Sequence, residues 1–231
     1  MACPRLLLLA GALCASTAGA QVSGTLSAIS DYRYRGVSLS QQKPAAQASI
    51  GYDDPRGFYG GLFGSTVEFS GATRASGQAL GYLGWVTPLG GGFHLDLGGD
   101  YSAFTDGHEY DFGEIYAGMT ASDCNVRLHY SPNYFGAGQA SWYAEINGSI
   151  PLASDFSFFA HLGVLVPIGQ GAYSYTATVR NPVDARVGIS HDFGGLTLQL
   201  AWVAINGYAT LYPLNGAQRR NTGVASVAWS F

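Results

Sequence analysis

The sequence predicts an all-β fold, a transmembrane antiparallel β-barrel of about 12 strands. Composition is the first observation behind this prediction, because only 11% of the 231 residues are charged and 47% are hydrophobic. The mean hydropathy is nevertheless just +0.10, and no stretch beyond the first twenty residues approaches the roughly 20 apolar residues of a spanning helix. The 33 glycines exclude a helical coiled coil. The net charge of −4 argues against a partner such as nucleic acid.

The second observation is strict alternation of apolar and polar residues, the signature of strands with one apolar face. Within 156–166, for example, Phe156, Phe158 and Leu162 share one face and His161 lies on the other. The segments with clear alternation are 93–104, 124–131, 141–150, 156–166 and 183–193. The remaining strands are expected over 22–39, 44–52, 58–69, 78–87, 110–120, 196–206 and 221–231.

The connections between these strands alternate in length. Tight turns are expected at 53–57, 88–92, 121–123, 151–155 and 193–195, where Gly, Pro, Asp and Ser gather. Other connections, several of them longer, fall at 70–77, 105–109, 135–139, 167–181 and 208–220. Short periplasmic turns and longer extracellular loops are typical of bacterial outer-membrane barrels.

A soluble barrel or sandwich would also alternate, but its polar face would carry many lysines and glutamates. This chain has a single lysine, Lys43, and its polar faces are mostly Ser, Thr, Asn, Gln and Gly. Aromatic residues near strand ends are expected to form two interfacial girdles. These residues are Tyr52, Phe58, Tyr59, Phe93, Tyr130, Tyr134, Phe156 and Trp229. A soluble β-sandwich or lipocalin-like barrel stays open as an alternative.

Residues 1–20 have the pattern of a secretory signal peptide, with Arg5 before a short apolar run. The expected cleavage site is formed by Ala18, Ala20 and Gln21. Cleavage would leave residues 21–231 as the barrel and Cys124 as its single cysteine, so neither an internal disulfide nor a cysteine-based metal site is expected. A buried N-terminal helix is the alternative. The expected location is the outer membrane of a Gram-negative bacterium.

The last strand ends with alternate apolar residues that include Val227, Trp229 and the terminal Phe231. This resembles the signal by which the barrel-assembly machinery recognises outer-membrane proteins, so that machinery is an expected partner. Outer-membrane lipid and lipopolysaccharide are further expected partners.

Several segments resemble the TorF-type porin family of small outer-membrane proteins. They are the segments Ser30–Ser38, Lys43–Gln47, Gly57–Gly61 and Ala121–Phe135. Together the specific motifs cover only a small part of the chain, and Leu39-Ser40 stands where the family pattern has a glutamine and a hydroxyl residue. The resemblance implies an outer-membrane barrel of porin type, with no settled substrate and no catalytic residues.

The first of these segments has its own physical interpretation. If residues 22–39 form one strand, Asp31, Arg33 and Arg35 share a face and Tyr32 and Tyr34 share the other. An arginine facing lipid would cost about 2–4 kcal/mol near the midplane. The charged face is therefore expected to line the lumen, with the tyrosines facing lipid.

The same reasoning assigns further charged residues to the lumen. The full set of lumen candidates is Asp31, Arg33, Arg35, Glu68, Asp96, Asp100, Glu114, Arg127, His129, Glu145, His161, Asp184 and Arg186. These side chains could line a constriction that sets ion preference, or they could pair with each other across the interior and plug it. Both outcomes stay open.

The expected function is a narrow channel for passive diffusion of small hydrophilic solutes or ions. Twelve strands give a backbone diameter of roughly 24 Å, which side chains would narrow to about 10 Å or less. The first alternative is a non-conducting structural or surface-binding barrel, with loops 167–181 and 208–220 as contacts. Arg219 and Arg220 could then meet lipopolysaccharide phosphates.

A lipid-modifying enzyme is a weaker alternative. His129 and Ser131 share a face, but that face is the lumen, and no Gly-x-Ser-x-Gly motif occurs. His94 and Asp96 also share a face, a pairing too common on polar strands to predict a metal. We therefore expect no enzyme, no cofactor and no metal.

Overall fold

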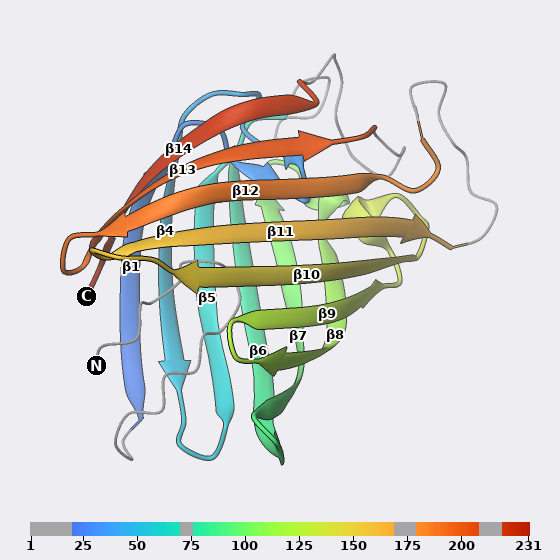
Figure 1. Cartoon of the computed structure of the whole chain (residues 1–231). Coiled ribbons are helices and arrows are strands. Elements are labelled where there is room, and N and C mark those ends of the chain that lie inside the picture. Colours follow the sequence, from blue (N-terminus) through green and yellow to red (C-terminus); the bar gives the residue numbers. More distant parts are fainter. Residues whose placement is uncertain (1–19, 70–75, 169–178, 208–218) are drawn as a thin grey trace.

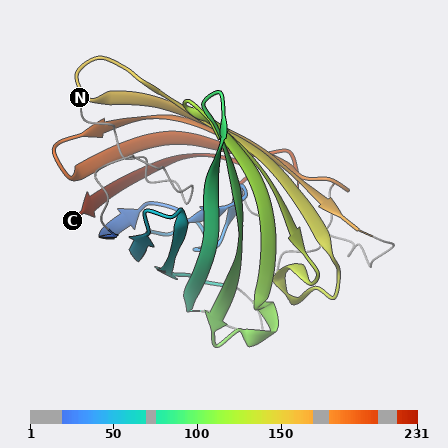
Figure 2. The ribbon, with the colours of Figure 1, turned by 90° about the horizontal axis from the view of Figure 1, so that it is seen from below.

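A computed structural model describes residues 20–69, 76–168, 179–207 and 219–231. Twelve strands form a closed antiparallel barrel, in which β1 pairs with both β4 and β14 and every other strand pairs with its neighbours in sequence. This confirms the predicted fold class. The five segments with clear alternation are all barrel strands, and Figures 1 and 2 show the strands as one curved wall. The barrel strands are β1 (Gln21–Ile29), β4 (Ala45–Asp53), β5 (Phe58–Thr66), β6 (Gly77–Gly90), β7 (Phe93–Thr105), β8 (Phe112–Ala121), β9 (Cys124–Ser131), β10 (Ser141–Pro151), β11 (Phe156–Pro167), β12 (Val183–Asp192), β13 (Leu196–Ile205) and β14 (Asn221–Ser230).

The outer face of this wall is apolar, because alternate residues along each strand point away from the interior. Leu83 on β6 is 72% exposed and Leu200 on β13 is 62% exposed. The residues beside them in sequence lie on the inner face, where Val86 and Ala201 are buried. Exposed apolar side chains in such a continuous band match the lipid-facing surface of a membrane barrel. No helix among the described residues is long and apolar enough to cross a membrane.

The first and last strands close the barrel. Leu26 on β1 lies opposite Trp229 on β14, and Gly24 and Phe231 exchange backbone hydrogen bonds of 2.9 and 3.0 Å. Val227, Trp229 and Phe231 lie on the outer face with 38%, 52% and 64% of their surface exposed. These three residues alternate along the sequence because they share the outer face of the closing strand. Their role as an assembly signal stays a prediction.

The two ends of the barrel differ as the connection lengths predict. Five short connections, 54–57, 91–92, 122–123, 152–155 and 193–195, lie at the end that holds both termini, here called the turn end (Figure 1). The connections at the other end, the loop end, are longer, and two of them contain the 3-10 turns η1 (His108–Tyr110) and η2 (Tyr134–Gly136).

The expected strand over 22–39 is wrong in its second half. β1 ends at Ile29, and residues 30–44 leave the wall and fold into the barrel, where β2 (Arg33–Tyr34) pairs with β3 (Val37–Ser38) as a separate hairpin. Arg35 and Gly36 form its turn with φ of +49° and +77°, values that an extended strand does not contain. Residues 30–44 are called the inner loop below.

This fold corrects the placement of four tyrosines. Tyr32 and Tyr34 belong to the inner loop and pack in the interior rather than against lipid. Tyr59 lies on the inner face because it follows the outward Phe58 by one residue, and Tyr134 in η2 is fully buried. None of the four can therefore form part of an interfacial girdle.

An apolar cluster fills the loop end of the interior. It joins inner-loop side chains such as Val37 and Leu39, both fully buried, to wall residues such as Phe104 and Phe112. Rings in this cluster pack closely, with 4.6 Å between the centroids of Phe112 and Phe135. Burial of these side chains stabilises the inner loop in its inward position.

Candidate functional site in the barrel lumen

Nine of the predicted lumen residues lie together on the inner faces of β7 to β12, and we call them the charged band. Glu145 illustrates the geometry, because it points inward between Ala144 and the outward Ile146, which is 44% exposed. The charged band comprises Asp96, Asp100, Glu114, Arg127, His129, Glu145, His161, Asp184 and Arg186. Their position is as predicted; their role in selecting ions stays a prediction.

Strand register places part of the band in one row across the wall. Asp96 lies opposite Gly118, Gly118 opposite Arg127, and Arg127 opposite Glu145. The row continues through Gly163 to Asp184. Two glycines, Gly118 and Gly163, therefore stand among four charged residues in this row, and they leave room for long side chains from neighbouring strands.

Asp96 and Arg127 form the first ion pair of the band. The Nη2 of Arg127 lies 2.5 Å from Oδ2 of Asp96, and both side chains are 8% exposed. The hydroxyl of Tyr59 donates to Asp96 Oδ1 over 2.5 Å, and it also lies 2.7 Å from the hydroxyl of Tyr116. The guanidinium of Arg127 stacks over Tyr116 at 4.5 Å. This charge pair is thus surrounded by polar and aromatic partners.

His161 forms the second group. Its Nε2 lies 2.9 Å from Asp184 Oδ1 and 3.0 Å from the Tyr143 hydroxyl, and its Nδ1 lies 2.7 Å from Asn147 Oδ1. Both ring nitrogens of His161 therefore have hydrogen-bond partners.

Glu114 anchors the inner loop to the wall. Arg35 donates from Nη1 and Nη2 to its two carboxylate oxygens over 2.9 and 2.6 Å, and the Tyr34 hydroxyl donates over 3.2 Å. The Arg35 guanidinium also lies 3.9 Å from the ring centroid of Tyr143 and 5.2 Å from that of Tyr134. A bidentate arginine–carboxylate pair surrounded by aromatic rings is among the stronger polar contacts in proteins. The inner loop thus crosses the lumen from β1 to β8.

Asp31 and Arg33 lie in the inner loop rather than on a wall strand. The Nε of Arg33 lies 2.8 Å from Asp31 Oδ2, and its Nη1 donates to the carbonyl oxygens of Gly36 and Arg219. Asp31 also accepts a 2.6 Å hydrogen bond from the Ser38 hydroxyl. Both residues therefore hold the hairpin in shape.

Glu68 lies away from the charged band. It follows the end of β5 and pairs with Lys43 over 2.6 Å, and the two side chains are 46% and 59% exposed. The expectation that Glu68 lines a constriction is wrong for this position, because the strand ends at Thr66 and the side chain lies at the rim.

The residues that sequence reasoning missed are inward aromatic ones, chiefly Tyr59, Tyr116 and Tyr143. The sequence does indicate their inward direction, because each tyrosine is separated by an even number of positions from a residue of the inner face on its own strand. Tyr143, for example, is two residues from Glu145. A β-carbon at Gly163 would collide with the Tyr143 hydroxyl, and one at Gly98 would collide with that of Tyr116. Part of the glycine content therefore makes space for lumen tyrosines.

The pairing of His129 with Ser131 does not form. The Ser131 hydroxyl donates instead to the carbonyl oxygen of Gly113 over 2.9 Å.

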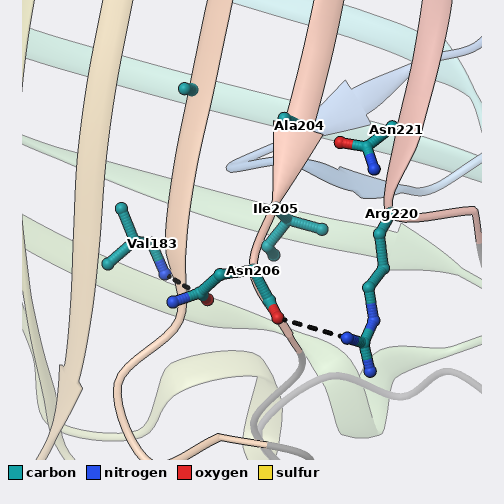
Figure 3. A pocket seen from close by; sticks show the side chains of 7 residues that line it. Val183, Ala204, Ile205, Asn206, Arg220 and Asn221 are labelled. Atoms are coloured by element: carbon teal, nitrogen blue, oxygen red, sulfur yellow. Dashed lines mark hydrogen bonds between the residues drawn. The ribbon is translucent and has the colours of Figure 1, made fainter.

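The two arginines proposed as lipopolysaccharide contacts lie at the loop end. Arg220 lines a shallow hollow between the ends of β12, β13 and β14, and its Nη1 donates to the Asn206 carbonyl oxygen over 3.4 Å (Figure 3). Most of loop 208–220 and of loop 167–181, and residues 1–19 of the expected signal peptide, lie outside the described residues.

A closed barrel with an apolar outer face and a charged inner face is a porin-type barrel. The chain belongs to the family described as "Bacterial protein of unknown function (Gcw_chp)", whose model matches residues 14–231. Among solved structures, the NanC porin superposes with a TM-score of 0.58 at 10% identity, over 91% of this chain and 99% of that one. The KdgM porin gives 0.55 at 12% identity, over 90% and 99% of the two chains. At these identities the likeness shows the fold alone. No curated protein sequence matches the chain.

Proposed function

We propose that this protein is a narrow channel of the Gram-negative outer membrane that passes small hydrophilic solutes or ions by passive diffusion. The observation that carries the proposal is the charged band on the inner face of a barrel whose outer face is apolar. Charges are costly in a dry interior, so a band of this kind favours a hydrated lumen. The porin-like fold of the neighbours supports the same function.

The charge balance of the lumen favours cations. The charged band holds five carboxylates and two arginines, and Arg35 adds a third arginine from the inner loop. Because the carboxylates outnumber the arginines, the interior is net negative when the histidines are neutral. Rings of acidic side chains favour cations in channels.

Charge also separates this lumen from that of one structural neighbour. A solved structure of the KdgM porin is a complex with disordered oligogalacturonate, and galacturonate carries a carboxylate. A net-negative lumen would repel such a solute, so we propose that this chain does not share that type of solute.

The narrowest part of the path is proposed to lie where Arg35 contacts Glu114. The inner loop spans the lumen there, and the apolar cluster above it fills the loop end. Solutes or ions would pass beside the inner loop, or the inner loop would have to move to let them through.

Planar-bilayer recording of the refolded protein tests this proposal. We expect discrete current steps and a reversal potential in a salt gradient that indicates cation preference. Arg35→Ala should raise the cation preference about twofold or more, because it leaves Glu114 unneutralised. Arg33→Ala tests whether the contacts that hold the inner loop, from Arg33 to Asp31 and to the Arg219 carbonyl, affect conductance. Gln47→Ala is the matched control, because Gln47 is an uncharged inward residue of β4 that bonds Ser27 and Ser65. Absence of current steps at every voltage would contradict the channel.

A non-conducting structural or surface-binding barrel is the second candidate. The observation in its favour is the apolar cluster between the inner loop and the wall. Replacing residues 33–38 by a Gly-Ser segment of equal length distinguishes the two. A protein that stays silent after this replacement is a non-conducting barrel, whereas the channel proposal expects a several-fold larger conductance.

Several further assignments belong to this proposal. The segment Ser30–Ser38, which carries the TorF-type resemblance, supports membership of that group of porins. A cleaved signal peptide, the barrel-assembly machinery and lipopolysaccharide are the proposed route and partners.

A further inference from the structure

Three wall residues of the charged band, Asp100, Glu114 and His129, gather at one point of the lumen. Asp100 on β7 lies directly opposite Glu114 on β8, and His129 on β9 lies opposite Tyr116, two residues farther along β8. One ligand atom from each of the three residues lies within 4.8 Å of the others. Glu114 is 5% exposed and His129 is 7% exposed.

The polar atoms of this cluster are buried but not hydrogen-bonded to one another. Asp100 Oδ1 and both ring nitrogens of His129 have no hydrogen-bond partner within the described part of the chain. His129 Nδ1 lies 3.7 Å from Glu114 Oε2, too far for a hydrogen bond. Atoms bound to Zn²⁺ at about 2.0–2.2 Å lie roughly 3.3–3.6 Å from one another in a tetrahedron. The 3.7 Å between His129 and Glu114 is close to this range, and the 4.8 Å bound on the other spacings requires a movement of about 1 Å or less to reach it.

The second nitrogen of His129 faces a carboxylate, as the second nitrogen of a metal-binding histidine often does. His129 Nε2 points to Glu145 Oε1 at 3.5 Å. Metal-ligating histidines almost always direct their other N–H to a carboxylate, a carbonyl or water. Glu145 is thus placed to orient the ring from behind.

The local charge also calls for a cation. Asp100, Glu114 and Glu145 supply three negative charges, and Arg35 supplies one positive charge on Glu114. Arg127 pairs with Asp96. An excess of two negative charges matches one divalent ion, and a carboxylate has enough acceptor positions for Glu114 to bind both Arg35 and the ion.

We propose that Asp100, Glu114 and His129 bind one divalent transition-metal ion in the lumen, with Glu145 as the residue that positions His129. One imidazole nitrogen and two carboxylate oxygens suit Zn²⁺ and its neighbours better than Mg²⁺ or Ca²⁺, which prefer oxygen ligands alone. Three protein ligands leave a fourth position facing the lumen.

Metal titration of the refolded full-length protein in detergent, after chelator treatment, tests this site. We expect calorimetry to show one Zn²⁺ per chain, unaffected by millimolar Mg²⁺. Co²⁺ should give the intense visible absorption of a four-coordinate ion bound to nitrogen and oxygen. The Co²⁺ spectrum of the unmodified protein needs no variant, so it is informative even if a variant fails to fold.

Three variants and a matched control assign the ligands. His129→Gln and Asp100→Asn should weaken Zn²⁺ binding at least 100-fold, and Glu145→Gln about 10- to 100-fold. His94→Gln is the control, because His94 lies on β7 six residues before Asp100 and outside the charged band, and the affinity of this variant should stay within threefold of the unmodified protein. Circular dichroism and heat-dependent gel mobility confirm that each variant is folded.

Two results would overturn the site. One is no saturable Zn²⁺ binding by the unmodified protein, in which case lumen water satisfies His129. The other is an equal loss of affinity in the His129 and His94 variants. Neither measurement uses conductance, so the metal site and the channel can fail separately.

Discussion

The inner wall of the barrel has two halves that share one backbone pattern and differ in chemistry. The charged half, β7 to β12, holds the charged band. The neutral half, formed by β13, β14, β1, β4, β5 and β6, presents Ser, Thr, Gln, Gly, Tyr and apolar side chains. Among the described residues its one inward charge is Asp53 at the turn end. A permeating cation would therefore meet its electrostatic partners on one side of the lumen.

The two halves also form different contacts. In the neutral half, neighbouring strands share weak side-chain hydrogen bonds, such as the 3.2 Å contact between the Thr25 and Ser230 hydroxyls and the 3.3 Å contact from Gln47 to Ser65. In the charged half, Glu114 binds two residues of the inner loop. The charged half thus holds the inner loop through an ion pair as well as through apolar side chains such as Phe104 and Phe112. Because the ion pair is found on this half, Glu114 is the strongest test of the comparison.

Glu114→Ala should give the largest loss of stability. It leaves the buried Arg35 guanidinium without its carboxylate, and removing one partner of a buried ion pair costs about 3–5 kcal/mol. Urea unfolding in the presence of chelator, followed by tryptophan fluorescence, measures the free energy of unfolding. Gln47→Ala in the neutral half is the control, with an expected loss of about 1 kcal/mol or less. Equal losses in the two variants would remove the distinction between the halves.

Alternation predicted the inward direction of most of the charged band, and together with the turn signals it predicted twelve strands. The register of 110–120, which holds Glu114, was ambiguous from the sequence. Alternation failed at residues 30–38, because a hairpin of two short strands alternates as a long strand does. The cues to the break were Ser30, Asp31 and Gly36, which are turn-forming residues within a run of apparent strand.

The contacts within the lumen depend on information that no single segment carries. Asp100, Glu114 and His129 lie on three strands, and only the register between those strands brings them together. Likewise, the approach of Arg35 to Glu114 joins residues 79 positions apart. Period two shows which face a residue occupies, but its depth in the barrel follows from the turns and the shear of the closed sheet.

Tyr59→Phe should have the next largest effect, because its hydroxyl joins the two halves. Tyr59 lies on β5 of the neutral half and donates to Asp96 on β7 of the charged half. A hydrogen bond to a charged group contributes about 1.5–3 kcal/mol, and the same loss is expected in urea unfolding. Tyr52→Phe is the matched control, since its hydroxyl makes only an exposed 3.4 Å contact with Asp54. A loss at Tyr59 no larger than at Tyr52 would show that the Tyr59–Asp96 hydrogen bond does not stabilise the contact between the halves.

Gly163→Ala should cause a smaller loss of stability. This loss depends on the tight polar packing that distinguishes the charged half from the neutral half. A methyl group there would meet the Tyr143 hydroxyl, which bonds His161 and Asp184, so the ring must move and those bonds must lengthen. Overpacking of this kind costs about 1–3 kcal/mol. Gly223→Ala on β14 is the control, because no atom lies within 4 Å of the added carbon, and alanine in place of glycine within a strand should stabilise by about 0.5–1 kcal/mol. Opposite signs for the two substitutions are therefore expected in urea unfolding. A stabilising Gly163→Ala would mean that Tyr143 has room to move, and the tight polar packing assigned to the charged half would then be wrong at its centre.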